Sequence, residues 1–126
     1  MTKKKKTILI VEDEESLLKA LDIKLTQEGY KTEKATDGEE GLKKFEKKIP
    51  DLVLLDIKMP KMDGLTMLKK LREKSKGKEV PVIILTNWGE MDKISKAIEL
   101  ETKYYLIKTD WDLDEVIQKV KSVLKK

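Results

Sequence analysis

The sequence contains no cysteine and no histidine among its 126 residues. The absence of cysteine excludes disulfide bonds, thiolate zinc sites and a cysteine nucleophile. The absence of histidine excludes a Ser-His-Asp triad, an HExxH motif and metal sites built on imidazole. Any bound metal ion must therefore be held by oxygen, which favours Mg²⁺, Mn²⁺ or Ca²⁺, and acid–base chemistry is left to carboxylates and lysines.

The sequence also lacks a signal peptide and any stretch long and apolar enough to span a membrane. We therefore expect a cytoplasmic protein with no membrane partner. The net charge is only +4, from 28 basic and 24 acidic residues, which is too mixed to indicate nucleic-acid binding. The run Lys3–Lys6 raises that possibility, but a terminal run of lysines is more typical of a solvated tail, and no nucleic-acid partner is expected.

The chain length fits one domain with a substantial core, and strand and helix patterns alternate along it five times. The predicted strands are Thr7–Val11, Tyr30–Ala35, Leu52–Leu55, Val80–Leu85 and Tyr104–Ile107. The predicted helices cover Ser16–Glu28, a segment that starts at Asp37-Gly38, a segment capped by Asp63, a short segment marked by Met91, Ile94, Ala97 and Ile98, and Leu113–Leu124. Such alternation predicts an α/β fold with a doubly wound, five-stranded parallel sheet and five helices. We expect a basic tail over residues 1–6 and a single domain over residues 7–126, with no output domain.

The stretch Asp51–Gly64, DLVLLDIKMPKMDG, contains a charged residue at a position where burying a charge carries a large free-energy penalty. Its apolar run Leu52–Leu55 shows no alternation, as expected for a strand buried on both faces. Asp56 follows at the end of that strand, and an ionised carboxylate there needs a cation or hydrogen-bond donors to compensate it. In open parallel sheets this carboxyl end is where ligands bind.

Four of the five predicted strands deliver polar groups to that same edge. These groups are Glu12 and Asp13, Asp56, Thr86, and Lys108. Three converging carboxylates repel one another unless a cation lies among them, and Mg²⁺ is the ion that fits best. A metal ion, an ammonium group and a hydroxyl group around Asp56 describe a cradle for a tetrahedral dianion, with Asp56 as nucleophile and a phosphoryl group as the group transferred.

Each of these residues also has a plainer interpretation. The two acids after the first strand can simply favour the dipole of the following helix. Thr86 can be a helix N-cap, and Lys108 a solvated lysine. Their coincidence at one sheet edge is what favours the functional interpretation.

With these motifs in place, the chain closely resembles the receiver domain of bacterial two-component response regulators, the CheY family. The segments that carry the resemblance are ILIVEDEES, LVLLDIKMPKMDG, VIILT and YYLIK, within a similarity from Ile8 to about Leu124. The resemblance implies the flavodoxin-like strand order 2-1-3-4-5.

The resemblance also implies roles for individual residues. Asp56 matches the phosphorylated aspartate, Asp13 the direct Mg²⁺ ligand and Glu12 the acid that holds the metal through water. The third protein ligand would be the backbone carbonyl of Lys58. Thr86 and Lys108 match the pair that grips the phosphoryl oxygens, and Tyr105 matches the aromatic that rotates inward after Thr86 moves.

In such proteins a histidine kinase or phosphotransfer protein donates the phosphoryl group, and the face made by helix four, strand five and helix five then signals to a partner. With no histidine in the chain, the donor must act in trans. The chain departs from the family pattern at Thr109 in place of proline, at Glu101-Thr102 in place of Gly-Ala, and at Asn87 and Trp88 after the threonine. Either Asp110 or Asp112 is expected to cap the last helix.

Two other functions are alternatives to a signalling protein controlled by phosphorylation. A haloacid dehalogenase-type hydrolase would use an Asp-x-Asp motif, whereas here Asp56 is followed by Ile57-Lys58. An adaptor with the same fold would bind partners without phosphorylation. We therefore expect a stand-alone phosphoacceptor protein. It is not expected to be an enzyme, apart from contributing catalysis to its own phosphorylation and dephosphorylation.

Overall fold

The computed structural model describes residues 5–57, 59, 61–74, 79–86, 104–107 and 112–124, with only the backbone described at residue 86 and over 104–107. Within these ranges the strands are β1 (Thr7–Val11), β2 (Lys31–Ala35), β3 (Leu52–Asp56), β4 (Val82–Thr86) and β5 (Tyr104–Ile107). The helices are α1 (Glu15–Gln27), α2 (Gly38–Lys47), α3 (Gly64–Glu73) and α5 (Leu113–Leu124). The helix predicted around Met91–Ile98 lies outside the described residues. No described helix has the length and apolar character needed to cross a membrane.

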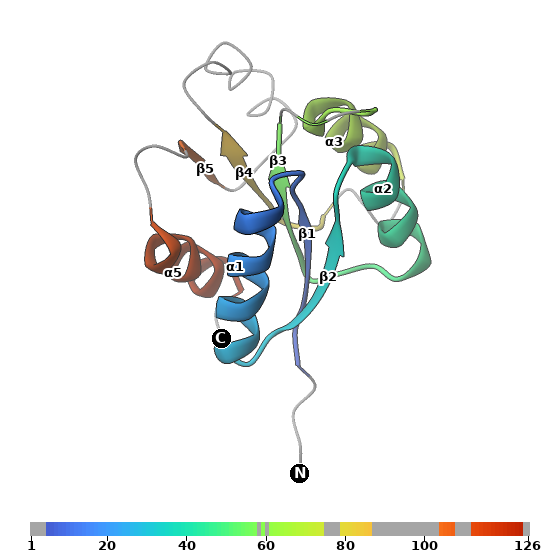
Figure 1. Ribbon diagram of the computed structural model, residues 1–126. Coiled ribbons are helices and arrows are strands. Elements are labelled where there is room, and N and C mark those ends of the chain that lie inside the picture. Colours follow the sequence, from blue (N-terminus) through green and yellow to red (C-terminus); the bar gives the residue numbers. More distant parts are fainter. Residues whose placement is uncertain are drawn as a thin grey trace.

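The strands form one parallel sheet in the order β2-β1-β3-β4-β5, with helices on both sides (Figure 1). This is the α/β fold and the strand order that the sequence analysis predicted. The most apolar strands, β1, β3 and β4, occupy the centre, and every residue of β1 and β3 is buried. The polar strand β2 lies at an edge, as expected for a strand with a polar outer face.

Successive residues of the central strands face opposite sides of the sheet and build two separate cores. On one side Leu9, Val53 and Ile84 pack with Phe45 of α2 and Leu68 of α3. On the other side the neighbouring residues of the same strands pack with helices α1 and α5, and this second core includes Ile10, Leu54, Ile83, Leu21 and Val120. A strand with a core on both faces needs apolar residues at every position, which explains the unbroken apolar runs in the sequence.

Aspartate side chains cap the N-termini of three described helices, α2, α3 and α5. Asp37 and Asp63 each accept a hydrogen bond at 2.8 Å, from the backbone N–H of Glu40 and Thr66 respectively. Asp112 accepts one from Glu115 N at 2.9 Å. The predicted cap at Asp63 is therefore confirmed, and Asp112, one of the two residues proposed to cap the last helix, is shown to do so. Each satisfies an N–H group that has no partner within its helix.

Two strand starts differ from the prediction. The strand expected from Val80 begins at Val82, because Pro81 has no N–H to donate and contributes only its carbonyl, which accepts from Val53 N at 3.0 Å. The strand expected from Tyr30 begins at Lys31. The N–H of Tyr30 instead donates to Leu25 O, within the turn that follows α1 and contains Gly29, where φ is +97°.

Asp22 joins α1 to the edge strand β2. It accepts a hydrogen bond from Thr32 Oγ1 at 2.5 Å and forms an ion pair with Lys34 at 3.1 Å. The hydrogen bond from Thr32 lowers the pKa of Asp22 below its ordinary value of 3.8; partial burial opposes this shift, and Lys34 reinforces it. A lowered pKa means that the folded state favours the ionised form.

We predict that Asp22→Asn lowers the free energy of unfolding by about 1 kcal/mol at neutral pH. The stabilisation by Asp22 is present above the ordinary carboxyl pKa and is lost as pH falls through the lowered one, so the variant and the wild type should converge in acid. Urea titrations across the acid pH range measure this. Asp114→Asn, which removes an exposed partner of Lys24, is the control and should change nothing measurable. A difference that persists unchanged into acid would contradict the assigned cause.

Gly64 lets the first turn of α3 lie directly against the end of β3. A Cβ atom added there would lie 2.1 Å from Asp56 O and 2.8 Å from Ile57 Cα, both of them backbone atoms. We predict that Gly64→Ala lowers the free energy of unfolding by more than about 2 kcal/mol, because the backbone must move. Gly41→Ala is the matched helical control; its Cβ would meet side-chain atoms of Met67 and Val11 at 3.0 Å. Chemical denaturation should show the smaller loss for this control, and an equal loss would contradict the prediction.

Candidate functional site

The strand register brings three acids to the carboxyl edge of the sheet. Val11 pairs with Leu55, so Glu12 follows β1 beside the position that Asp56 occupies at the end of β3. Asp56 in turn pairs with Leu85 of β4. Parallel strands all end at one edge, and so acids that are more than 40 residues apart in sequence become neighbours in space.

The carboxylate groups of Glu12, Asp13 and Asp56 form a compact cluster. One oxygen from each lies within 4.8 Å of the others. Glu12 is fully buried and Asp56 is 3% exposed, whereas Asp13 is exposed to solvent. The predicted convergence of these three residues is confirmed, and the cluster is open to solvent on the side of Asp13.

Backbone contacts fix the first acid of the cluster. The N–H of Glu12 donates to Ala35 O at 3.0 Å, which extends the pairing of β1 with the edge strand β2. The Glu12 carboxylate accepts a hydrogen bond from Glu14 N at 3.0 Å. The side chain thus contacts the N-cap residue of α1, and the N-terminal end of a helix is a favourable place for negative charge.

The loop after β3 is held from two sides. Gly64 N donates to Ile57 O at 2.7 Å, and Gly38 N, at the start of α2, donates to Met62 O at 3.0 Å. A Cβ at Gly38 would lie 2.3 Å from Met62 O, so only glycine allows this approach. Between these contacts Lys61 has a positive φ of 65°.

Sequence reasoning missed these positioning residues. It treated Asp37-Gly38 as a helix start, and Asp63-Gly64 as turn-forming residues with Asp63 as a helix cap. The signal available in the sequence was the repeated Asp-Gly pair, an aspartate that caps a helix followed by a glycine that admits a close backbone contact. The sequence of either segment alone does not show which backbone atoms these Asp-Gly pairs contact.

The remaining predicted site residues are described in part or not at all. The backbone of Thr86 ends β4 and pairs with Ile107 of β5, one position beyond the pair formed by Asp56 and Leu85. The side chains of Thr86 and Tyr105 lie outside the described part of the chain, as do Lys58, Lys108, Trp88, Thr109 and Asp110 entirely.

The cluster has the character of a site for a hard divalent cation. Three carboxylates this close repel one another, and a cation among them removes that repulsion. All available ligand atoms are oxygens, and the exposed side leaves room for coordinated water, which Mg²⁺ usually retains. The residues present therefore fit Mg²⁺. A carboxylate of this cluster is also suited to act as a nucleophile.

Comparisons with known proteins agree with this geometry. Residues 8–121 match the family described as the response regulator receiver domain. The chain is 37% identical to "Probable transcriptional regulator ycf27" of Pyropia yezoensis, over 100% of this chain and 50% of that protein. It is 38% identical to "Chemotaxis protein CheY" of Treponema pallidum, over 94% of this chain and 82% of that protein.

A solved structure shows the same similarity in three dimensions. The crystal structure of a putative response regulator from Chloroflexus aurantiacus superposes with a TM-score of 0.88 at 31% identity, covering 98% of this chain and all of that one. The chain spans about half the length of the first curated relatives that it matches. The match over most of its length, the parallel sheet and the acidic cluster at its carboxyl edge together place this chain in the response regulator receiver domain family.

Proposed function

We propose that this chain is a phosphoacceptor switch in which Asp56 receives a phosphoryl group. The observation that carries the proposal is the cluster of Glu12, Asp13 and Asp56 at the carboxyl edge of a receiver-family sheet. Asp56 is nearly buried yet lies beside an exposed acid, so a reacting group can approach from the side of Asp13. Neither core needs a carboxylate at this position, which favours a chemical role over a packing role.

Mg²⁺ is the proposed cofactor. Asp13, Asp56 and the backbone carbonyl of Lys58 would hold it directly, and Glu12 would hold it through water. When bound, the ion neutralises charge that develops on the transferred phosphoryl oxygens. Glu12 is fully buried, and one of its carboxylate oxygens lies within 4.8 Å of oxygens of the two aspartates that would hold the ion.

In the proposed transfer an Asp56 carboxylate oxygen attacks the phosphorus of a phosphohistidine. The new oxygen–phosphorus bond forms as the phosphorus–nitrogen bond breaks, and the donor's imidazole keeps that electron pair and takes up a proton. Lys108 and Thr86 would contact the phosphoryl oxygens. The donor is a histidine kinase or phosphotransfer protein acting in trans, because this chain has no histidine.

The proposed output follows from Thr86 and Tyr105. Movement of Thr86 toward the phosphoryl group would let Tyr105 turn inward and change the surface formed by the fourth helix, β5 and α5. A downstream protein partner would bind that surface. The chain would act as a signalling component in the cytoplasm and would catalyse only its own phosphorylation and dephosphorylation.

We predict that Asp56→Asn abolishes phosphoryl uptake from acetyl phosphate with Mg²⁺ and leaves the fold intact. An amide cannot form the acyl phosphate, and removing one of three crowded charges should not lower stability. Intact mass and circular dichroism measure the two effects. Asp63→Asn is the matched control, because asparagine caps a helix as well as aspartate does, and it should retain uptake.

The same assay separates the competing functions. A labile adduct on the wild type supports the switch, steady consumption of acetyl phosphate a hydrolase, and an unchanged mass a constitutive adaptor. A loss of stability above about 2 kcal/mol in Asp56→Asn would mean that Asp56 has a structural role.

We also predict that Mg²⁺ stabilises the wild type against unfolding and does not stabilise Asp13→Asn. Ligand binding adds RT ln(1 + [L]/Kd), so Mg²⁺ at about ten times Kd raises the free energy of unfolding by about 1.4 kcal/mol. Without metal, Asp13→Asn should be at least as stable as the wild type, since a repulsive charge is gone. Thermal unfolding with and without Mg²⁺ tests both statements. An equal response of the two proteins to Mg²⁺ would place the ion elsewhere.

A further inference from the structure

The loop between β3 and α3 contains a backbone conformation that L-amino acids rarely adopt. Lys61 has a φ of 65°, and it is the one residue other than glycine with a positive φ in the part of the chain that the structure describes. In the left-handed region the Cβ atom comes too close to the following carbonyl oxygen, so every residue except glycine is strained there. Such a conformation persists only where the surrounding structure holds it, and residues of this kind cluster at functional sites.

The lysine side chain does not account for this conformation. The side chain is 65% exposed, and its ammonium group lies 3.8 Å from Asp37, which is a long distance for an ion pair. A pair with one partner in solvent contributes little stability, because water and salt screen it. The left-handed turn is therefore held by backbone contacts near Lys61.

Two backbone hydrogen bonds hold the residues that follow Lys61. Met62 O accepts from Gly38 N at 3.0 Å, and Gly64 N donates to Ile57 O at 2.7 Å. The first bond fixes the loop against the start of α2, and the second closes the loop on the end of β3. Rotation about the N–Cα bond of Lys61 turns the residues after it relative to Ile57, so a change to negative φ displaces these contacts.

The residues that precede Lys61 are held by the core. Ile57 is fully buried and Met59 is 9% exposed, and both belong to the core on the side of α2 and α3. Lys58 stands between them in the sequence, and its backbone carbonyl is the third ligand of the proposed Mg²⁺ site. The residues on both sides of this ligand are therefore fixed.

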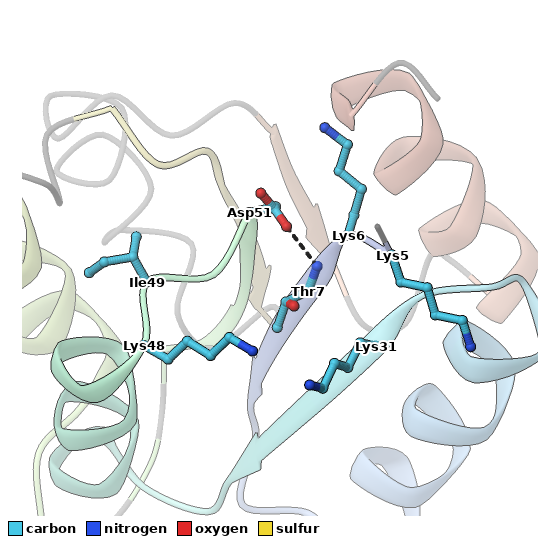
Figure 2. Close-up of a pocket in the computed structure, with 7 residues that line it drawn as sticks. All are labelled: Lys5, Lys6, Thr7, Lys31, Lys48, Ile49 and Asp51. Carbon is cyan, nitrogen blue, oxygen red and sulfur yellow. Dashed lines mark hydrogen bonds between the residues drawn. The ribbon is translucent and has the colours of Figure 1, made fainter. Parts of the chain in front are cut away.

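Strand β3 is also held at its other end. Asp51 Oδ2 accepts a hydrogen bond from Thr7 N at 2.7 Å, and Asp51 N donates to Thr7 O at 2.8 Å (Figure 2). This reciprocal pair joins the starts of β1 and β3. Sliding of β3 along its axis would break the pair, so the loop after β3 is the part that sets the geometry beside Asp56.

We propose that Lys61 is a positioning residue, whose left-handed backbone conformation holds the loop between β3 and α3 in the form that binds Mg²⁺. The inference rests on the proposed function, since it concerns the same Mg²⁺ site. A residue that resists positive φ lets the loop populate other conformations, and only a fraction of the molecules is then ready to bind the ion. The apparent affinity falls by that fraction.

The test compares substitutions of Lys61 that remove the same charge and differ in backbone preference. Lys61→Gly should bind Mg²⁺ within about twofold of the wild type, because glycine populates positive φ about as readily as negative φ. Lys61→Val should bind Mg²⁺ at least about fivefold more weakly than Lys61→Gly, because a β-branched residue strongly disfavours the left-handed region. Isothermal titration calorimetry, well below the temperature of unfolding, measures each dissociation constant.

A purely structural role would give a different pattern. Lys61→Val would then unfold at a lower temperature without Mg²⁺, but the dissociation constant of the folded protein would not change, and the inference would be overturned. Lys61→Ala, which is less strained at positive φ than valine, is the second variant if Lys61→Val does not fold, and its affinity should lie between those of the other two. Lys74→Val is the matched control, because Lys74 also forms an ion pair but has a φ of −83°, and it should bind Mg²⁺ like the wild type.

The same titrations separate this inference from the proposed function. Weaker binding in Lys61→Val, with wild-type affinity in Lys61→Gly and Lys74→Val, supports the inference. If the wild type binds Mg²⁺ and Asp13→Asn does not, while Lys61→Val binds as tightly as Lys61→Gly, the inference is overturned and the metal site stands. If the wild type does not bind Mg²⁺, or if Asp13→Asn binds it equally well, both the metal site and the inference are overturned.

Discussion

Electrostatic repulsion among Glu12, Asp13 and Asp56 is the constraint around which this molecule is arranged. Two of these carboxylates are almost fully buried, and all three present oxygens within 4.8 Å of one another. Removing such groups from water carries a free-energy penalty of several kcal/mol for each ion unless other charges or donors compensate it. The fold keeps them together because β1 and β3 are adjacent and parallel and are packed between two apolar cores.

The rigid sheet and the closely packed adjoining turns hold the acidic cluster in place. Gly64 lets α3 begin against the backbone of Asp56, and Gly38 ties the start of α2 to the loop between β3 and α3. The acid that reacts in the proposed chemistry therefore stands on a strand that cannot shift without disturbing both cores. Groups held on rigid elements keep their geometry better than groups on free loops, which is the requirement for a site that must exclude other reactions.

The two edges of the sheet carry opposite charge although the chain as a whole is nearly balanced. The carboxyl edge gathers acids, and the amino edge gathers Lys5, Lys6, Lys31 and Lys48. β1, which leads directly to Glu12, and β3, which ends at Asp56, both begin beside those lysines.

Much of the fold followed from local patterns. Unbroken apolar runs marked the central strands, and apolar stripes marked the described helices. Asp63 was recognised as a cap from its position, and Asp112 was one of two candidates for the cap of the last helix. The strand starts that differed, at Val80 and Tyr30, depended on which partner each backbone N–H group found. Such partners lie elsewhere in the chain or in the preceding turn, so pattern alone did not resolve them.

Sequence by itself determined the class of fold, the family and the three acids, because strand ends in a parallel sheet must share an edge. Only the tertiary structure decided the close backbone contacts at Gly38 and Gly64, since each requires knowing which segment packs against the glycine. It alone also turned the lysines before β1 from an apparent tail into part of a pocket with Lys31 and Lys48. The sequence alone does not show which residues surround a run of charges, because those residues come together only when the strands pair.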